Sequence, residues 1–324
     1  MLDFNVSLSA TVEPDKLWDL VIIGGGPAGL TAGLYAARYK LDVLLLEKAI
    51  VSGGQLTSTQ WVENYPGFPE PVLGARLAAD MEAQARLFGL KIVTETVKSV
   101  SLAGPVKEVV TDYAGYKAKT VLIATGSSPR KLGLPNEADY SGRGVSYCAT
   151  CDGPFYPDKT VAVVGGGNSA FEESLFIAKY AAKIYIIHRR DSFSADPILQ
   201  ERVKAEPRIE LITNTQVTAL NFGTEAPRSI SLKNTQTGAE SQLEVDGIFV
   251  FVGNLPNTSL FESQLDLEQG YIVTDRHYRT SLEGVWAVGD VQAGALRQVA
   301  TAVGDGAGAA YNINKYLLDE SLEA

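Results

Sequence analysis

The chain has 324 residues, a length that allows about two domains, each with its own buried core. Apolar residues make up 45% of the chain and charged residues 20%, a globular composition that excludes a disordered or fibrous protein. Acidic residues outnumber basic ones by 38 to 28, a net charge of −10 that excludes the basic surface typical of nucleic-acid-binding proteins.

The N-terminal stretch, residues 1–17, is interpreted as a loose extension that lacks the basic start and apolar core of a signal peptide. Residues 20–37 are uncharged over a length that raises the question of a membrane span. Glycines at 24, 25, 26, 29 and 33 interrupt this stretch. A buried strand that runs into a glycine turn and a helix explains it better, so we expect no membrane segment.

Two segments share one pattern of strand, glycine turn and helix. The first, DLVIIGGGPAGLTAGLYAARY, has an apolar strand over 20–23 and then Gly24, Gly26 and Gly29. The second, TVAVVGGGNSAFEESLFIAKY, has Gly165, Gly167 and Ala170 at the matching positions. A further apolar strand follows each, LDVLLLEK in the first case and KIYIIHRR in the second.

This pattern is typical of a dinucleotide site. The first glycine allows a tight turn, the second lets a pyrophosphate approach the backbone, and the third position lets the helix pack on the strand. The helix N-terminus then offers N–H groups and a favourable dipole to the anion. A single such motif is weak evidence, but two copies in the right context predict two dinucleotide sites rather than two ligand-free turns.

The ends of the two second strands differ. Glu47 can accept hydrogen bonds from a ribose 2′-hydroxyl, which suits FAD or NAD. His188, Arg189 and Arg190 stand at the matching place in the second unit, and two guanidinium groups suit a 2′-phosphate. The first unit therefore predicts an FAD site and the second an NADPH site. The alternative is that these three residues only face solvent, because Asp191 follows them.

The C-terminal part completes the first domain. Residues 270–290 are predicted as strands that end at Gly289-Asp290, and residues 296–310 as the start of a helix of small residues. No third dinucleotide unit follows. We therefore predict an α/β fold of two Rossmann-like, three-layer dinucleotide-binding domains, the second inserted into the first. The FAD domain comprises 1–127 plus 254–324, and the NAD(P)H domain 128–253, with turn-rich boundaries.

The only two cysteines form a Cys148-Ala-Thr-Cys151 segment in the second domain. This spacing allows a small redox-active disulfide. A zinc site needs further ligands, and with only His188 and His277 in the chain we predict no metal. Asp152 is a candidate proton donor and acceptor, or alternatively a helix cap. Two inert buried thiols remain an alternative, and the low cysteine content favours a cytoplasmic protein.

In their order, these motifs resemble the low-molecular-weight thioredoxin reductases over residues 18–318. The blocks that carry the resemblance are GGGPAG at 24–29, GGQL at 53–56, VENYPGFPE at 62–70, ATGSSPR at 124–130, YCATCDGPF at 147–155, GGGNSA at 165–170, HRRD at 188–191, GVWAVGDV at 284–291 and LRQVATAVGDGA at 296–307. The CATCD block between the two nucleotide motifs is the most specific of them.

The resemblance implies a cytoplasmic homodimer that reduces the disulfide of thioredoxin, or of a thioredoxin-like redoxin, with electrons from NADPH. It implies that each chain binds one non-covalent FAD and that one domain rotates against the other. Cys148 would be the attacking thiol, Cys151 would face the flavin, and Asp152 would be the acid–base group. The implied FAD residues are Gly24, Gly26, Pro27, Ala28, Gly29, Glu47, Gly54, Gln55, Leu56, Asn64, Val97, Thr125, Gly126, Gly289, Asp290, Arg297, Gln298 and Val299. The NAD(P)H residues are Gly165, Gly167, Asn168, Ser169, Ala170, His188, Arg189 and Arg190.

One departure from the family pattern leaves the electron donor open. The family's NADPH signature, HRRxxxR, ends here in Ser194, so one guanidinium is missing. NADH is therefore an alternative donor, as are ferredoxin or a second FAD in the nucleotide site. An alternative of another class is a flavin-binding redox sensor in which the two cysteines only switch conformation.

Overall fold

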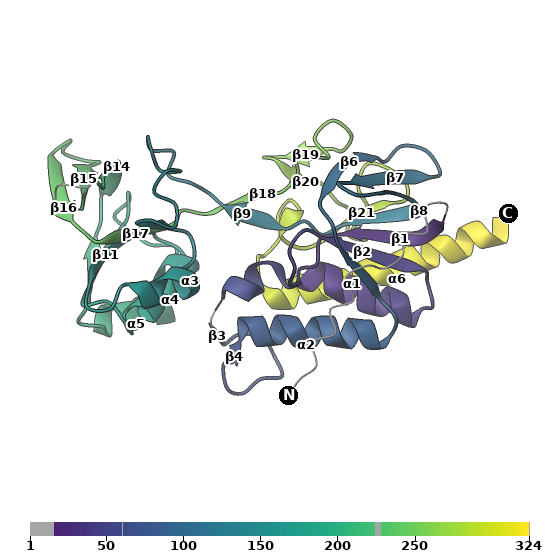
Figure 1. Cartoon of the computed structure of the whole chain (residues 1–324), viewed down its shortest axis with the longest axis horizontal. Coiled ribbons are helices and arrows are strands. Elements are labelled where there is room, and N and C mark those ends of the chain that lie inside the picture. Colours follow the sequence, from purple (N-terminus) through teal and green to yellow (C-terminus); the bar gives the residue numbers. More distant parts are fainter. Residues whose placement is uncertain (1–15, 60, 224–227, 324) are drawn as a thin grey trace. The chain divides into compact units, whose positions relative to one another are not determined.

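The computed structural model describes residues 16–59, 61–223 and 228–323 (Figure 1). Contacts between Cα atoms divide the chain into two units. Unit 1 comprises the residues up to Ser127 and from Pro256 onward, and unit 2 comprises Ser128–Leu255. Residues 1–15 of the predicted extension lie outside the described residues, and Leu17 is already the first residue of a strand.

Unit 1 is built on a seven-stranded sheet with the order β5-β2-β1-β8-β7-β6, in which β21 also pairs with β8. The strands β5, β2, β1, β8 and β21 pair in parallel, whereas β6, β7 and β8 pair antiparallel. The bounds are β1 (Leu17–Ile23), β2 (Val43–Glu47), β5 (Lys91–Thr94), β6 (Val97–Ser101), β7 (Lys107–Thr111), β8 (Gly115–Ile123) and β21 (Val285–Ala287).

Helices α1 (Pro27–Arg38) and α6 (Val299–Glu323) pack on each other, and α2 (Gly74–Leu87) packs beside α1 (Figure 1). Along β1, Leu20 and Ile22 belong to the core shared with α1 and α6, whereas Val21 and Ile23 belong to a second core on the opposite face. Because both faces of the sheet are buried, its central strands are continuous apolar runs.

Unit 2 has three layers. A five-stranded parallel sheet, β10-β17-β11-β12-β13, lies between a helical core cluster and a second cluster that includes residues of an antiparallel sheet, β14-β15-β16. The strands are β10 (Val145–Ser146), β11 (Thr160–Gly165), β12 (Lys183–Ile187), β13 (Ile209–Ile212), β14 (Thr215–Asn221), β15 (Ser229–Asn234), β16 (Glu240–Glu244) and β17 (Gly247–Phe251). The helices are α3 (Ala149–Asp152), α4 (Asn168–Ile177) and α5 (Pro197–Ala205).

The two crossover segments between the units pair with each other as β9 (Ser127–Pro129) and β18 (Asn254–Pro256). The remaining short elements are β3 (Trp61–Val62) with β4 (Val72–Leu73), β19 (Leu267–Glu268) with β20 (Tyr271–Ile272), and the 3-10 turns η1 (Gly54–Ser58), η2 (Gly153–Phe155) and η3 (Gly289–Val291). Within the described ranges, no helix has the length and apolar character needed to cross a membrane. The predicted α/β fold class is confirmed.

Candidate functional site: two glycine turns and a disulfide

The first glycine turn joins β1 to α1 in unit 1. Gly24 has a φ of +106°, and a side chain there or at Gly29 would collide with neighbouring backbone carbonyl oxygens. At Gly26, in contrast, no atom lies within 4 Å of an added Cβ. Pro27 then opens α1, whose first turn contains no acidic residue. The turn is thus packed on its inner side and accessible to an anion at Gly26.

Glu47, at the end of β2, supports this turn. Its side chain is 8% exposed, and Oε2 accepts a hydrogen bond from Gly25 N at 2.6 Å while Oε1 accepts one from Ala49 N at 2.8 Å. A carboxylate has about four acceptor positions, so it retains capacity for a ligand hydroxyl. Glu95 N donates to Glu47 O at 2.9 Å, which brings the start of β6, and with it Val97, to the same end of the sheet.

Asp290, in η3, is the second acidic group of this site. Gln55 Nε2 donates to Asp290 Oδ2 at 3.2 Å and to Ser127 Oγ at 3.1 Å, and Ser127 Oγ donates to Asp290 Oδ2 at 3.2 Å. Burial raises the pKa of Asp290, although Ser127, Arg297 and Gln55 act in the opposite direction. Four separate segments of unit 1 therefore meet at this carboxylate.

Further hydrogen bonds hold four of the other predicted flavin residues. Asn64 Nδ2 donates to Gln298 Oε1 at 2.8 Å, next to Val299, where α6 begins. Asn257 N donates to Gly126 O at 3.0 Å, and Thr125 Oγ1 donates to Asn257 O at 2.8 Å. Neither Asn257 nor Ser127 was among the predicted residues; Ser127 lies within the ATGSSPR block, whereas no sequence motif marks Asn257.

Two close approaches complete the first site. A Cβ on Gly54 would lie 3.4 Å from the Cα of Gly26, and a Cβ on Gly289 would lie 3.1 Å from the Cβ of Ala28. Leu56, which follows in η1, is buried. The segments 54–56 and 289–290 thus lie against the first glycine turn, and together these residues fit an elongated anionic dinucleotide.

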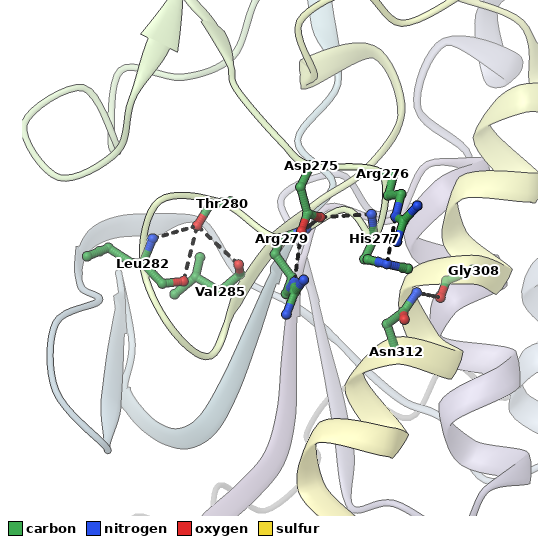
Figure 2. A network of polar contacts seen from close by, with 9 residues as sticks. All are labelled: Asp275, Arg276, His277, Arg279, Thr280, Leu282, Val285, Gly308 and Asn312. Carbon is green, nitrogen blue, oxygen red and sulfur yellow. Dashed lines mark hydrogen bonds and ion pairs between the residues drawn. The ribbon is translucent and has the colours of Figure 1, made fainter. Parts of the chain in front are cut away.

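A turn that precedes β21 is held by one carboxylate (Figure 2). Asp275 Oδ1 accepts hydrogen bonds from His277 N at 2.8 Å and from Arg279 N at 3.0 Å, and Oδ2 accepts one from Arg279 Nε at 2.9 Å. The turn places Tyr278 at a φ of +65°, a conformation that bulky residues rarely adopt. Burial raises the pKa of Tyr278, and the charge of Asp305 on α6 acts in the same direction.

Asp305 links α6 to the Asp290 segment. Its Oδ2 accepts hydrogen bonds from Gly289 N at 3.3 Å and from Gln292 Nε2 at 3.0 Å. Burial raises the pKa of Asp305, and the charge of Asp290 acts in the same direction. Asp305 was not among the predicted site residues, although its position as the one acidic residue in the small-residue run VGDGAGAA could have indicated it.

The second glycine turn joins β11 to α4 in unit 2. A side chain at Gly165 would collide with Phe251 O and would place its Cβ 2.7 Å from that of Ala170. Gly167 is the N-cap of α4, which starts at Asn168, and Ser169 is exposed. This turn has the close packing that the pattern predicts for its first and third positions.

The residues after β12 lie against the second turn. A Cβ on Gly166 would be 2.5 Å from His188 Nδ1, so the imidazole covers the turn. Burial lowers the pKa of His188, and the charges of Arg190 and Arg189, both exposed, act in the same direction. Ser194 N donates to Gly166 O at 2.8 Å and its Oγ to the same oxygen at 3.3 Å. Ser194 therefore lies on the turn itself.

Cys148 lies between β10 and α3 and is disulfide-bonded; the chain's only other cysteine is Cys151. Thr150 Oγ1 lies 3.4 Å from Cys148 Sγ. Asp152 N donates to Cys148 O at 3.1 Å. The Asp152 side chain is half-buried. Burial of Tyr156 raises the pKa of that tyrosine, and the negative charge of Asp152 raises it further. In the described ranges, no three His, Cys, Asp or Glu side chains group as a metal site.

Helix α4, which packs against α3, carries a further acidic group with a shifted pKa. Glu173 is half-buried, and burial, with a smaller contribution from the charge of Glu172, raises its pKa from 4.5 to about 7. The predicted flavin residues all belong to unit 1, whereas the predicted NAD(P)H residues and the cysteines belong to unit 2.

Comparison with known proteins decides the family. The model of the pyridine nucleotide-disulphide oxidoreductases matches residues 18–306. The chain belongs to this family. A protein from Listeria innocua named thioredoxin reductase is 45% identical over 313 residues, which cover 96% of this chain and 98% of that protein. A protein from Mycobacterium leprae named bifunctional thioredoxin reductase/thioredoxin is 43% identical over 310 residues, 95% of this chain and 67% of that protein.

Among solved structures, that of Lactococcus lactis thioredoxin reductase matches with a TM-score of 0.90 and 39% identity, covering 93% of this chain and 99% of that one. The resemblance inferred from the sequence motifs is therefore confirmed. As a pyridine nucleotide-disulphide oxidoreductase of this kind, the protein is a flavin-dependent oxidoreductase that uses FAD and a pyridine nucleotide.

Proposed function

We propose that this protein is a thioredoxin-disulfide reductase that passes electrons from NADPH through FAD and the Cys148–Cys151 disulfide to thioredoxin. The observation that carries the proposal is the disulfide at Cys148, in the unit that also holds the second glycine turn. A glycine turn of the same kind in unit 1 accounts for a second dinucleotide. The names of the relatives support thioredoxin as the substrate.

In unit 1, the proposed FAD residues are the eighteen implied by the family resemblance. Gly26 and the N-terminus of α1 would receive the pyrophosphate, and Glu47 a ribose hydroxyl. Asp290, held by Gln55 and Ser127, would accept a further hydroxyl. Bound FAD supplies reversible two-electron transfer between a nicotinamide and a disulfide.

In unit 2, Gly167 and the N-terminus of α4 would receive the pyrophosphate of NADPH. Asn168, Ser169 and Ala170 follow in that helix. His188, Arg189 and Arg190 would face the 2′-phosphate, and the exposure of both arginines leaves their guanidinium groups accessible. NADH is the alternative donor, favoured by the position of Ser194 on the turn.

The thiol chemistry is assigned to three residues. Cys148, as a thiolate, attacks one sulfur of the thioredoxin disulfide, forms a mixed disulfide and releases the other thioredoxin sulfur as a thiolate. Cys151 then attacks the Cys148 sulfur, which restores the intramolecular disulfide and frees the second thioredoxin thiol. Asp152 holds and delivers the proton that the leaving sulfur needs. The Thr150 hydroxyl, 3.4 Å from Cys148 Sγ, is placed to donate to the thiolate.

The family resemblance also supports a cytoplasmic homodimer and hinges at β9 and β18. These two strands are suited to be hinges, because hinge residues are often few and lie at the ends of elements. Domain rotation in solution would let unit 2 serve two reactions in turn.

The test is anaerobic reduction of the purified holoprotein, followed by flavin absorption, with NADPH in one sample and NADH in another. We expect NADPH to bleach the flavin and the reduced protein to reduce thioredoxin. The Cys148→Ser variant is expected to retain bleaching and lose thioredoxin reduction. Bleaching by NADH alone would show that NADH, and not NADPH, is the electron donor. No bleaching by either nucleotide, or full thioredoxin turnover by Cys148→Ser, would refute the proposed relay.

A further inference from the structure

A buried carboxylate lies in the segment that precedes the cysteines of unit 2. Glu137 is 3% exposed, and its Oε1 accepts hydrogen bonds from Tyr147 Oη at 2.6 Å and from Leu132 N at 2.8 Å. Its Oε2 accepts from Gly133 N at 2.7 Å and from Leu134 N at 3.2 Å. Burial raises the pKa of Glu137, but these donors outweigh it and the net pKa lies below the ordinary value. Glu137 is therefore ionised at neutral pH.

The backbone around Cys148 has little regular support. Strand β10 pairs with β17 through only Val145 and Ser146, and the following helix α3 has four residues. Ser146 Oγ accepts a hydrogen bond from Cys148 N at 3.1 Å and donates one to Cys148 O at 3.0 Å. Tyr147 lies between these two residues. The position of Cys148 thus depends on the side chains that precede it.

The far side of the Glu137 contact is firmly held. Leu132 and Leu134 pack against the core cluster that contains Val145 and Ile248, and the Tyr147 ring packs against the same cluster. The carboxylate therefore joins the hydroxyl of Tyr147 to backbone that is already anchored in the core. Packed cores deform little, so this contact restricts the residue next to Cys148.

We propose that Glu137 is a positioning residue for the dithiol–disulfide chemistry, holding Cys148 through Tyr147 in the place where it pairs with Cys151. The inference rests on the proposed function, in which these cysteines form the redox pair. Two thiols held rigidly near each other have a high effective concentration, which favours the disulfide. Release of Tyr147 lowers this concentration and shifts the equilibrium toward the dithiol.

The test measures this equilibrium in the full-length holoprotein. The protein dithiol and oxidised dithiothreitol exchange with the protein disulfide and reduced dithiothreitol, and alkylation followed by mass measurement counts the thiols. We expect Tyr147→Phe to shift the equilibrium toward the dithiol by up to about tenfold, the value reached when the charged hydrogen bond is made only in the disulfide form. This corresponds to a potential about 30 mV more oxidising. Glu137→Gln is expected to shift it in the same direction and at least as far.

A matched control exists in unit 1, where Tyr116 Oη donates to Glu95 Oε2 at 2.9 Å, and Glu95 is also buried. Tyr116→Phe removes the same kind of bond far from the cysteines in sequence. We expect it to lower stability to a similar degree and to leave the thiol equilibrium within about twofold. If Tyr147→Phe also leaves the equilibrium within that range, the positioning role is overturned.

The two proposals fail separately. The dithiothreitol titration uses neither a nucleotide nor thioredoxin, so a wild-type protein without thioredoxin activity would refute the proposed function and leave this test valid. A wild-type protein that reduces thioredoxin, with an unshifted thiol equilibrium in Tyr147→Phe and Glu137→Gln, would overturn only the role of Glu137.

Discussion

Replacement of Glu173 by glutamine is expected to stabilise the protein at and above neutral pH. Glu173 lies half-buried on α4, and burial together with the charge of Glu172 raises its pKa from 4.5 to about 7. Between these values the folded chain binds more protons than the unfolded chain. The free energy of unfolding therefore falls as the pH rises through this window, and it stays lower above it.

The magnitude follows from the shift. Each unit of pKa corresponds to about 1.36 kcal/mol, so ionised Glu173 costs at most about 3.4 kcal/mol, and partial solvent exposure reduces this cost to about 1–3 kcal/mol. Glutamine has nearly the same shape and no charge. The stability difference between Glu173→Gln and the wild type is thus expected to be small near about pH 4.5 and to reach about 1–3 kcal/mol above about pH 7.

The assay is denaturant unfolding followed by far-ultraviolet circular dichroism from about pH 5 to about pH 8, with equal flavin loading in all proteins. Glu201→Gln is the control, because Glu201 is an exposed glutamate on α5 of the same unit, and we expect it to change stability by less than about 0.5 kcal/mol. A constant difference between Glu173→Gln and the wild type over this pH range would refute the reasoning.

Substitutions at three further positions test the two proposed nucleotide sites. Ser194→Arg restores a guanidinium and is expected to tighten NADPH binding about 10- to 100-fold with little change for NADH, measured by anaerobic flavin titration. Gly166→Ala forces His188 off the turn, since the added Cβ would lie 2.5 Å from Nδ1; we expect weaker binding of both nucleotides and unchanged flavin content, and retained affinity would contradict it. Asp305→Ala removes the acceptor of Gly289 N and is expected to release flavin, measured as the FAD content after dialysis, whereas Asp305→Asn is expected to retain most of it.

The sequence alone determined the fold class and the two glycine turns. Each turn is a local unit of strand, glycine turn and helix, in which neighbouring residues dictate the conformation. Gly24 and Gly29 are required by close backbone contacts within that unit and with the adjacent strand. The central strands are apolar on both faces, because both faces of the sheet are buried. They therefore stand out in the sequence as continuous apolar runs. The predicted small-residue helix begins at Val299 rather than at residue 296 and extends to Glu323.

Only the tertiary structure decided how distant residues meet. Gln55 and Asp290 are 235 positions apart and share a hydrogen bond, and no periodicity relates them. The same holds for Asn64 with Gln298 and for Thr125 with Asn257. Contacts of this kind, and the burial that raises a pKa, depend on packing between segments rather than on the order of residues within one. The sequence could therefore reveal which chemistry the chain carries, whereas the folded chain determined which groups hold that chemistry in place.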